Sequence, residues 1–216
     1  PDFDDNPWNY KFTWNPKNVV LAGTSGASYL KDGKITNYDY KDVFSNIERV
    51  FIPNYGEFES YANRDSLHYQ EKYNLTDAET IVRGTLRRVG FSKAWNVFVQ
   101  LGMTSNDPDE KIISLDQFNN YLKKINDNDI LEKMSYLELF SDSSILRKYH
   151  SNADYLINVL KSKWSLNPGD KDMIVMQHKF DYILNGNHKT IKLSMVVKGD
   201  DDIQTAMAKT VGLPVF

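Results

Sequence analysis

Arginine is unevenly distributed along this 216-residue chain. Four of its six arginines lie within one short region, as Arg64, Arg83, Arg87 and Arg88. A guanidinium can bind a carboxylate through two parallel hydrogen bonds, which the ammonium group of lysine cannot do. In a strand over 79–88, Arg83, Thr85 and Arg87 would share one face, with the two arginines roughly 13 Å apart. This spacing predicts a row that binds two separated carboxylates; the alternative is a solvated strand face with surface ion pairs.

A second group of polar residues, Asn63, Arg64 and Asp65, lies at a predicted junction between a strand over 58–62 and a helix over 66–74. Loops at strand ends often carry binding groups. We therefore expect Asn63 and Arg64 to contribute to a site. The alternative is a plain capping turn in which Asp65 or Ser66 begins the helix.

Other kinds of site are not indicated. The four histidines have no metal-ligand spacing, so no metal site is expected. His178 shares strand parity with Met176 and Phe180, which predicts a core histidine. No phosphate-binding loop and no serine nucleophile motif occurs. Cysteine is absent, which favours a reducing compartment, and we expect the cytoplasm. The net charge of −3 predicts neither nucleic acid nor membrane as a partner.

The stretch "NVVLAGTSGASYL" at 18–30 begins like a dinucleotide loop, but Gly23 and Gly26 lack the G-x-G-x-x-G spacing. Asn15 followed by Pro16 is typical of a helix start, and Asp32 followed by Gly33 of a helix end. Apolar residues between them recur at helical spacing. We predict one helix over 16–32; the alternative is a strand with a turn.

The remaining pattern predicts the α+β class, with a mixed or antiparallel sheet flanked by helices. Strands are predicted at 34–38, 49–53, 58–62, 79–88, 172–183 and 188–198. Helices are predicted at 66–74, 92–102, 114–125, 129–140, 152–164 and 201–212. Since three of these helices follow one another without a strand, we expect residues 1–110 and 169–216 to form one α/β domain and residues 111–168 an all-helical insertion.

Six blocks resemble one known family, in order and across nearly the whole chain. They are "NPWNYKFTW" at 6–14, "DGKI" at 32–35, "NRDSLHY" at 63–69, "RGTLR" at 83–87, "VMQHKF" at 175–180 and "MAKTVGLPV" at 207–215. Together they resemble the non-nucleotide portion of the saccharopine dehydrogenases of the glutamate-forming type. Such enzymes interconvert saccharopine with glutamate and 2-aminoadipate 6-semialdehyde in lysine metabolism.

The resemblance implies an oxidoreductase whose NADP or NAD is bound mainly by a Rossmann domain outside this chain. The chain would then be a substrate-binding and dimerisation fragment, inactive alone, with its own Rossmann domain and a second copy as partners. The family's "KFSW"-like segment lies at the substrate, which here implies contacts from Lys11, Phe12, Thr13 and Trp14. Lys17 stands where an arginine is expected, so its contact would be weaker.

By position and chemistry we add Asn63, Arg64, Arg83 and Thr85 as substrate contacts. No residue of this chain is assigned as the catalytic acid or base. Two alternatives stay open at this point. One is a sister dehydrogenase that acts on another amino-acid or polyamine conjugate, of the carboxynorspermidine type. The other is a ligand-binding module without catalysis.

Overall fold

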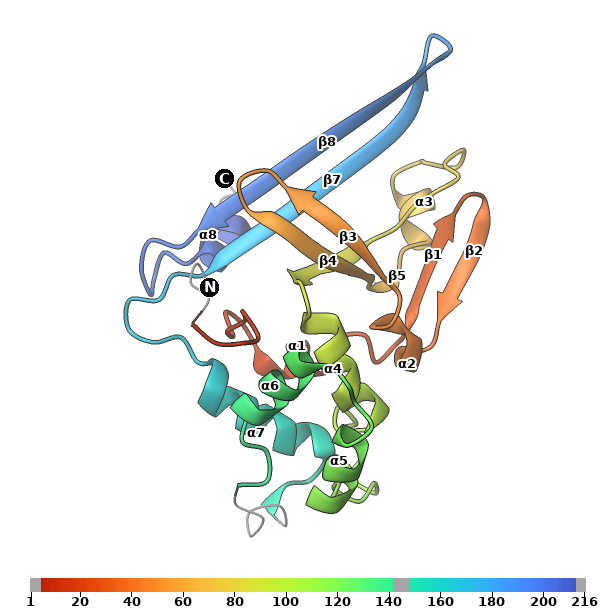
Figure 1. The fold of residues 1–216 in the computed structure, drawn as a ribbon. Coiled ribbons are helices and arrows are strands. Elements are labelled where there is room, and N and C mark those ends of the chain that lie inside the picture. Colours follow the sequence, from red (N-terminus) through yellow and green to blue (C-terminus); the bar gives the residue numbers. More distant parts are fainter. Residues whose placement is uncertain (1–4, 142–147, 213–216) are drawn as a thin grey trace.

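The strands lie at one end of the molecule, together with the short helices over 68–72 and 206–212, and the helices between residues 91 and 164 lie at the other end (Figure 1). The computed structural model describes residues 5–141 and 148–212. Its strands form three small sheets, ordered β2–β1–β5, β3–β4–β6 and β7–β8. Strand pairing is antiparallel except between β1 and β5, which run parallel. The predicted α+β class, with mixed and antiparallel pairing, is confirmed.

The predicted helix over 16–32 is wrong beyond its first turn and a half. Helix α1 spans only Pro16–Val20, and Asn15 caps it by accepting a hydrogen bond from the Lys17 amide. Gly23 and Gly26 then adopt φ of +87° and +70°, which a right-handed helix excludes.

The second half of that stretch is strand β1 (Ala27–Lys31), which pairs with β2 (Lys34–Tyr38). Asp32 and Gly33 both have positive φ and form the two-residue turn between these strands. Gly26 is required here because a Cβ at this position would collide with the carbonyl oxygen of Tyr38. The Asp-Gly pair is therefore a hairpin turn rather than a helix end.

The second sheet carries most of the arginine region and is called the central sheet here. It consists of β3 (Ile47–Ile52), β4 (Gly56–Ala62) and β6 (Gly84–Arg88). The elements next to these strands along the chain are α2 (Tyr40–Val43), β5 (Arg64–Asp65) and α3 (His68–Lys72). β6 is shorter than the predicted strand over 79–88. Arg83 lies just outside it, while Ile81 forms only an isolated bridge to Leu30.

The helices pack around an aromatic core. They are α4 (Phe91–Gln100), α5 (Leu115–Leu122), α6 (Asn128–Tyr136) and α7 (Asn152–Trp164). Side-chain caps from Ser114, Asp127 and Ser151 start the last three. Trp8 from the N-terminal segment lies within 5.2 Å of Trp164 and 5.7 Å of Phe91, measured between ring centroids. Since one continuous core joins these helices to the N-terminal segment, the boundaries of the predicted helical insertion stay a prediction.

A long hairpin projects from the other end (Figure 1). Strands β7 (Met173–Leu184) and β8 (Asn187–Lys198) meet at an Asn185–Gly186 turn, and helix α8 (Ala206–Gly212) follows. His178 is exposed on this hairpin, so the prediction of a core histidine is wrong. The strand parity was correct, but in the part of the chain that the structure describes no element buries that face.

The base of the hairpin is fixed by Asp172. Its carboxylate is 2% exposed and accepts hydrogen bonds from the Ala206 amide at 2.6 Å and the Met207 amide at 3.0 Å. These bonds hold the first turn of α8 against β7.

Across residues 5–141 and 148–212, we find no helix with the length and apolar character that a membrane span requires.

Candidate functional site

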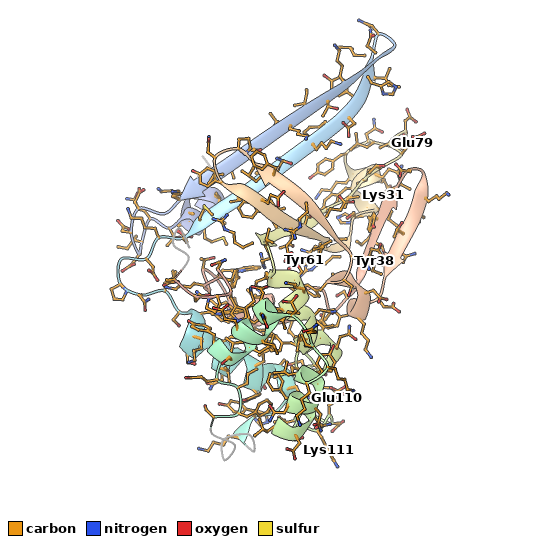
Figure 2. The ribbon with its side chains drawn as sticks, viewed as in Figure 1. Lys31, Tyr38, Tyr61, Glu79, Glu110 and Lys111 are labelled. Atoms are coloured by element: carbon orange, nitrogen blue, oxygen red, sulfur yellow. The ribbon has the colours of Figure 1, made fainter. Side chains whose placement is uncertain are left out.

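An open cleft with a volume of 2130 Å³ lies between the central sheet, strand β7 and the segment after α3. The N-terminal segment around Tyr10 closes its lower end. Figure 2 shows Tyr61 at this end, where β4 meets the helices, and Glu79 and Lys31 near the opposite end. Seven of the nine predicted contacts line the cleft: Lys11, Thr13, Trp14, Asn63, Arg64, Arg83 and Thr85.

Phe12 and Lys17 are the two that do not line it. Phe12 belongs to the aromatic core, 8% exposed, and its amide donates to the Trp164 carbonyl at 2.8 Å. Lys17 is exposed on α1. Neither residue belongs to the lining that includes Thr13 and Trp14, so their direct contact with a substrate stays a prediction.

Lys11 is buried and already paired. Its ammonium lies 2.5 Å from the Asp170 carboxylate and forms a second ion pair with Asp5. These bonds attach the N-terminal segment to the loop before β7. Lys11 therefore holds one wall of the cleft in place with a charge that two carboxylates already neutralise.

The sheet end of the cleft is a small hydrogen-bonded unit. The Asn63 side chain donates to the Thr85 hydroxyl at 3.0 Å, and the Asn63 amide donates to the Arg83 carbonyl at 3.0 Å. Arg64 adopts φ of +60°, an uncommon backbone conformation for this residue type. Strained positions of this kind cluster at binding sites. The two residues at the end of β4 are thereby fixed beside the start of β6.

Arg83 extends from this unit at the rim of the cleft. Its side chain is exposed, and its Nη1 donates to the Tyr69 hydroxyl at 3.3 Å. Within the described part of the chain this is its one side-chain hydrogen bond, and a single long bond to a neutral partner leaves most of the guanidinium donors available to a ligand.

Arg87 belongs to the predicted arginine row, but it is not among the nine predicted contacts. Its guanidinium lies 5.1 Å from the centroid of the Tyr10 ring and 5.4 Å from that of Phe91. Nη1 donates to the Leu86 carbonyl at 3.0 Å, while Nε is buried without a hydrogen-bond partner among residues 5–141 and 148–212. Among the residues that the structure describes, no acidic side chain forms an ion pair with it. The alternation of β6 carried the signal for this residue, since Arg87 shares the Thr85 face.

Two tyrosines complete the surroundings of Arg87, and no pattern in the sequence predicted their place there. Tyr10 and the 2%-exposed Tyr61 both line the cleft. Burial raises the pKa of the Tyr10 phenol, although the positive charge of Arg87 opposes the shift. The Tyr10 phenol is thus a neutral hydroxyl at neutral pH, next to a fixed positive charge. A guanidinium beside phenol hydroxyls suits a carboxylate ligand.

The chain is similar over its whole length to proteins of one known family. A family model described as "Saccharopine dehydrogenase C-terminal domain" matches residues 1–216. The chain is 33% identical to the saccharopine dehydrogenase [NADP(+), L-glutamate-forming] of Saccharomyces cerevisiae, over 100% of this chain and 54% of that protein. It is 35% identical to the mitochondrial alpha-aminoadipic semialdehyde synthase of Mus musculus, over 99% of this chain and 26% of that protein.

A solved structure shows the same fold. The apo histidine-tagged saccharopine dehydrogenase (L-Glu forming) from Saccharomyces cerevisiae superposes with a TM-score of 0.81 at 31% identity, covering all of this chain and 54% of the other. The chain thus spans about half the length of the fungal relatives and about a quarter of the mouse one. A family model that matches along the whole chain and a shared fold lead to one conclusion: the chain belongs to the saccharopine dehydrogenase C-terminal domain family.

Proposed function

We propose that the cleft binds saccharopine, and that the chain is the substrate-binding part of a protein interconverting saccharopine with glutamate and 2-aminoadipate 6-semialdehyde. The observation that carries this proposal is Arg87, whose guanidinium lines the cleft with a buried Nε that has no partner. A buried N–H donor without a hydrogen-bond partner is costly, and a bound carboxylate that accepts from it would remove that cost.

The other arginines fit a ligand with several carboxylates. Saccharopine is extended and carries three carboxylate groups. Arg83 and Arg64 line the same cleft as Arg87 and have exposed side chains, so a second carboxylate can reach them while the first is held at Arg87. Asn63 and Thr85 lie between these cations and offer neutral polar groups. A ligand with one carboxylate would leave part of this set unused.

For the cofactor we propose NADP, which the names of the fungal relatives specify, with NAD as the alternative. Residues 1–216 contain no G-x-G-x-x-G, so their own glycines do not suit a dinucleotide. We propose that a Rossmann domain outside these residues binds the nucleotide and supplies the hydride acceptor. In this proposal, the cleft contributes binding and orientation of the substrate carboxylates.

We also propose a homodimer, supported by the outer face of the β7–β8 hairpin. The strand register places six apolar side chains on that face, each between 39% and 56% exposed: Met176, Phe180, Tyr182, Leu184, Ile191 and Leu193. The opposite face carries Gln177, Lys179 and Asp181, which line the cleft, and also Ile183, which is 65% exposed. Met176 and Tyr182 of the apolar face line the cleft as well. Sedimentation velocity would test the dimer.

The cytoplasm is the proposed compartment, and imaging of a fluorescent fusion would test it.

The experiment that tests the proposed activity uses the complete product of the gene that encodes this chain. It should reduce NADP when saccharopine and the nucleotide are supplied together, and calorimetry should detect saccharopine binding without nucleotide. A panel that includes carboxynorspermidine and single amino acids provides the comparison. Turnover of a panel member in place of saccharopine, or no binding of saccharopine, would refute the assignment.

A further inference from the structure

We propose that Glu59 is a positioning residue for Arg87, and that it acts through the first turn of α4. The inference rests on the proposed function, because it treats Arg87 as the carboxylate receptor of the cleft. Glu59 lies in the middle of β4 and is 1% exposed. A buried carboxylate in a strand interior needs a specific reason to be there.

The strand register makes the position of Glu59 unusual. It lies directly opposite Arg49 of β3 on one side and Arg87 of β6 on the other. Cross-strand partners in antiparallel sheets lie close enough for opposite charges to pair. Among the ion pairs of the described residues, however, Glu59 takes part in none. Its charge is used elsewhere.

The carboxylate of Glu59 binds the start of helix α4. One oxygen accepts a hydrogen bond from the Gly90 amide at 3.2 Å, and the other accepts one from the Ser92 amide. These are unpaired donors at a helix N-terminus, where negative charge is also favoured by the helix dipole. Gly90 has φ of +88°, so the chain turns sharply there between β6 and α4.

The residue between those two amides is Phe91, whose ring lies against the Arg87 guanidinium. Glu59 therefore fixes both neighbours of the residue that supports one side of the receptor. The Tyr10 ring also lies against the guanidinium, which is 5.1 Å from the ring centroid, and contacts Phe91 at 5.4 Å between ring centroids. The Arg87 guanidinium therefore keeps a defined orientation. The Glu59 carboxylate, which lies opposite Arg87 in the sheet, stays bound to α4 and leaves Arg87 free for a ligand.

The test uses Glu59→Gln in the complete gene product. The glutamine carbonyl can accept one of the two amide hydrogen bonds, but its NH₂ group faces the other amide as a second donor. The first turn of α4 should shift and loosen the Phe91 ring. The readout is solvent exchange of the Arg87 Nε–H, measured by ¹⁵N NMR without ligand. The signal is assigned with Arg87→Lys, which lacks it. Exchange should become at least about tenfold faster, because that is the ratio expected for loss of one charge-assisted hydrogen bond.

The same variant should raise the dissociation constant for saccharopine about tenfold and leave the KM for the nucleotide within about twofold. Asp172→Asn is the matched control, because Asp172 is an equally buried carboxylate that binds two amides at the start of α8. It should lower the free energy of unfolding without changing Arg87 exchange. If Glu59→Gln does not fold, Glu59→Asp, whose shorter side chain reaches only one amide, makes the same comparison.

Unchanged Arg87 exchange in a folded Glu59 variant would overturn the inference, as would equal exchange rates in the Glu59 and Asp172 variants. Exchange is measured without ligand, so this result is separate from the proposed function. Faster exchange in a protein that does not bind saccharopine would uphold the positioning role of Glu59 and refute only the substrate.

Discussion

Replacement of Arg87 by lysine tests the carboxylate receptor directly. Lysine keeps the positive charge but loses the planar fork, including the buried Nε, which has no hydrogen-bond partner among the described residues. A bidentate contact would become a single contact. One charge-assisted hydrogen bond contributes about 1.5–3 kcal/mol, which corresponds to roughly a 10- to 100-fold weaker affinity. Arg87→Lys should therefore raise the dissociation constant for saccharopine by that factor.

The assay combines calorimetry with steady-state kinetics, because each detects a different failure. The KM for saccharopine should rise in parallel with the dissociation constant, while the KM for the nucleotide stays within about twofold. Arg49→Lys is the control, since Arg49 is exposed on β3 and does not line the cleft. Unchanged saccharopine affinity in a folded Arg87→Lys protein would refute the assignment of Arg87 as a carboxylate contact.

Three further predictions concern the rim and the supports of the cleft. Arg83→Lys should raise the KM for saccharopine far more than that for the nucleotide, and an equal change in both would contradict a carboxylate contact. Gly26→Ala should lower the free energy of unfolding by at least about 1 kcal/mol in urea denaturation, because φ is positive there and a Cβ meets the Tyr38 carbonyl. The hydrogen bond and charge of Lys11 lower the pKa of Asp170, so this carboxylate contributes stability that is present above its unfolded pKa and is lost as pH falls through the folded value. Asp170→Asn should thus be less stable than the wild type at pH 7, and this difference should shrink as urea titrations approach pH 3; a constant difference would contradict the linkage.

Much of the secondary structure could be predicted because its causes are local. The alternation of Ile191, Leu193 and Met195 predicted strand β8, and the strand forms there. The helical spacing after Ser151 likewise predicted α7, whose cap is in place. Short-range patterns suffice where the period of the apolar residues matches only one kind of element.

The stretch over 16–32 shows where such patterns fail. Its apolar residues fit helical spacing, and Asp32 followed by Gly33 is typical of a helix end. Only the pairing of β1 with β2 makes Asp32 and Gly33 a hairpin turn, and that pairing depends on residues further along the chain. The close contact between Gly26 and Tyr38 exists only once the hairpin has formed.

The candidate site was predicted in part for a similar reason. Arginine spacing along one strand located Arg83 and Thr85, because their relation is local. The role of Arg87 depends on rings from two distant segments, Tyr10 and Phe91. Single-sequence patterns do not report which rings meet after folding, so this part of the cleft needed the structure.

The charge of Arg87 has one consequence for measurements on this protein. Burial works against the charged form of the Arg87 guanidinium, but the neighbouring phenols outweigh it and its pKa lies above even the usual high value. The receptor therefore stays cationic at every pH at which the protein is folded. Any change of saccharopine affinity between mildly acidic and neutral pH must then come from protonation of the ligand or of another group. Binding experiments at a series of pH values would therefore measure the titration of those groups, because the charge of Arg87 stays constant.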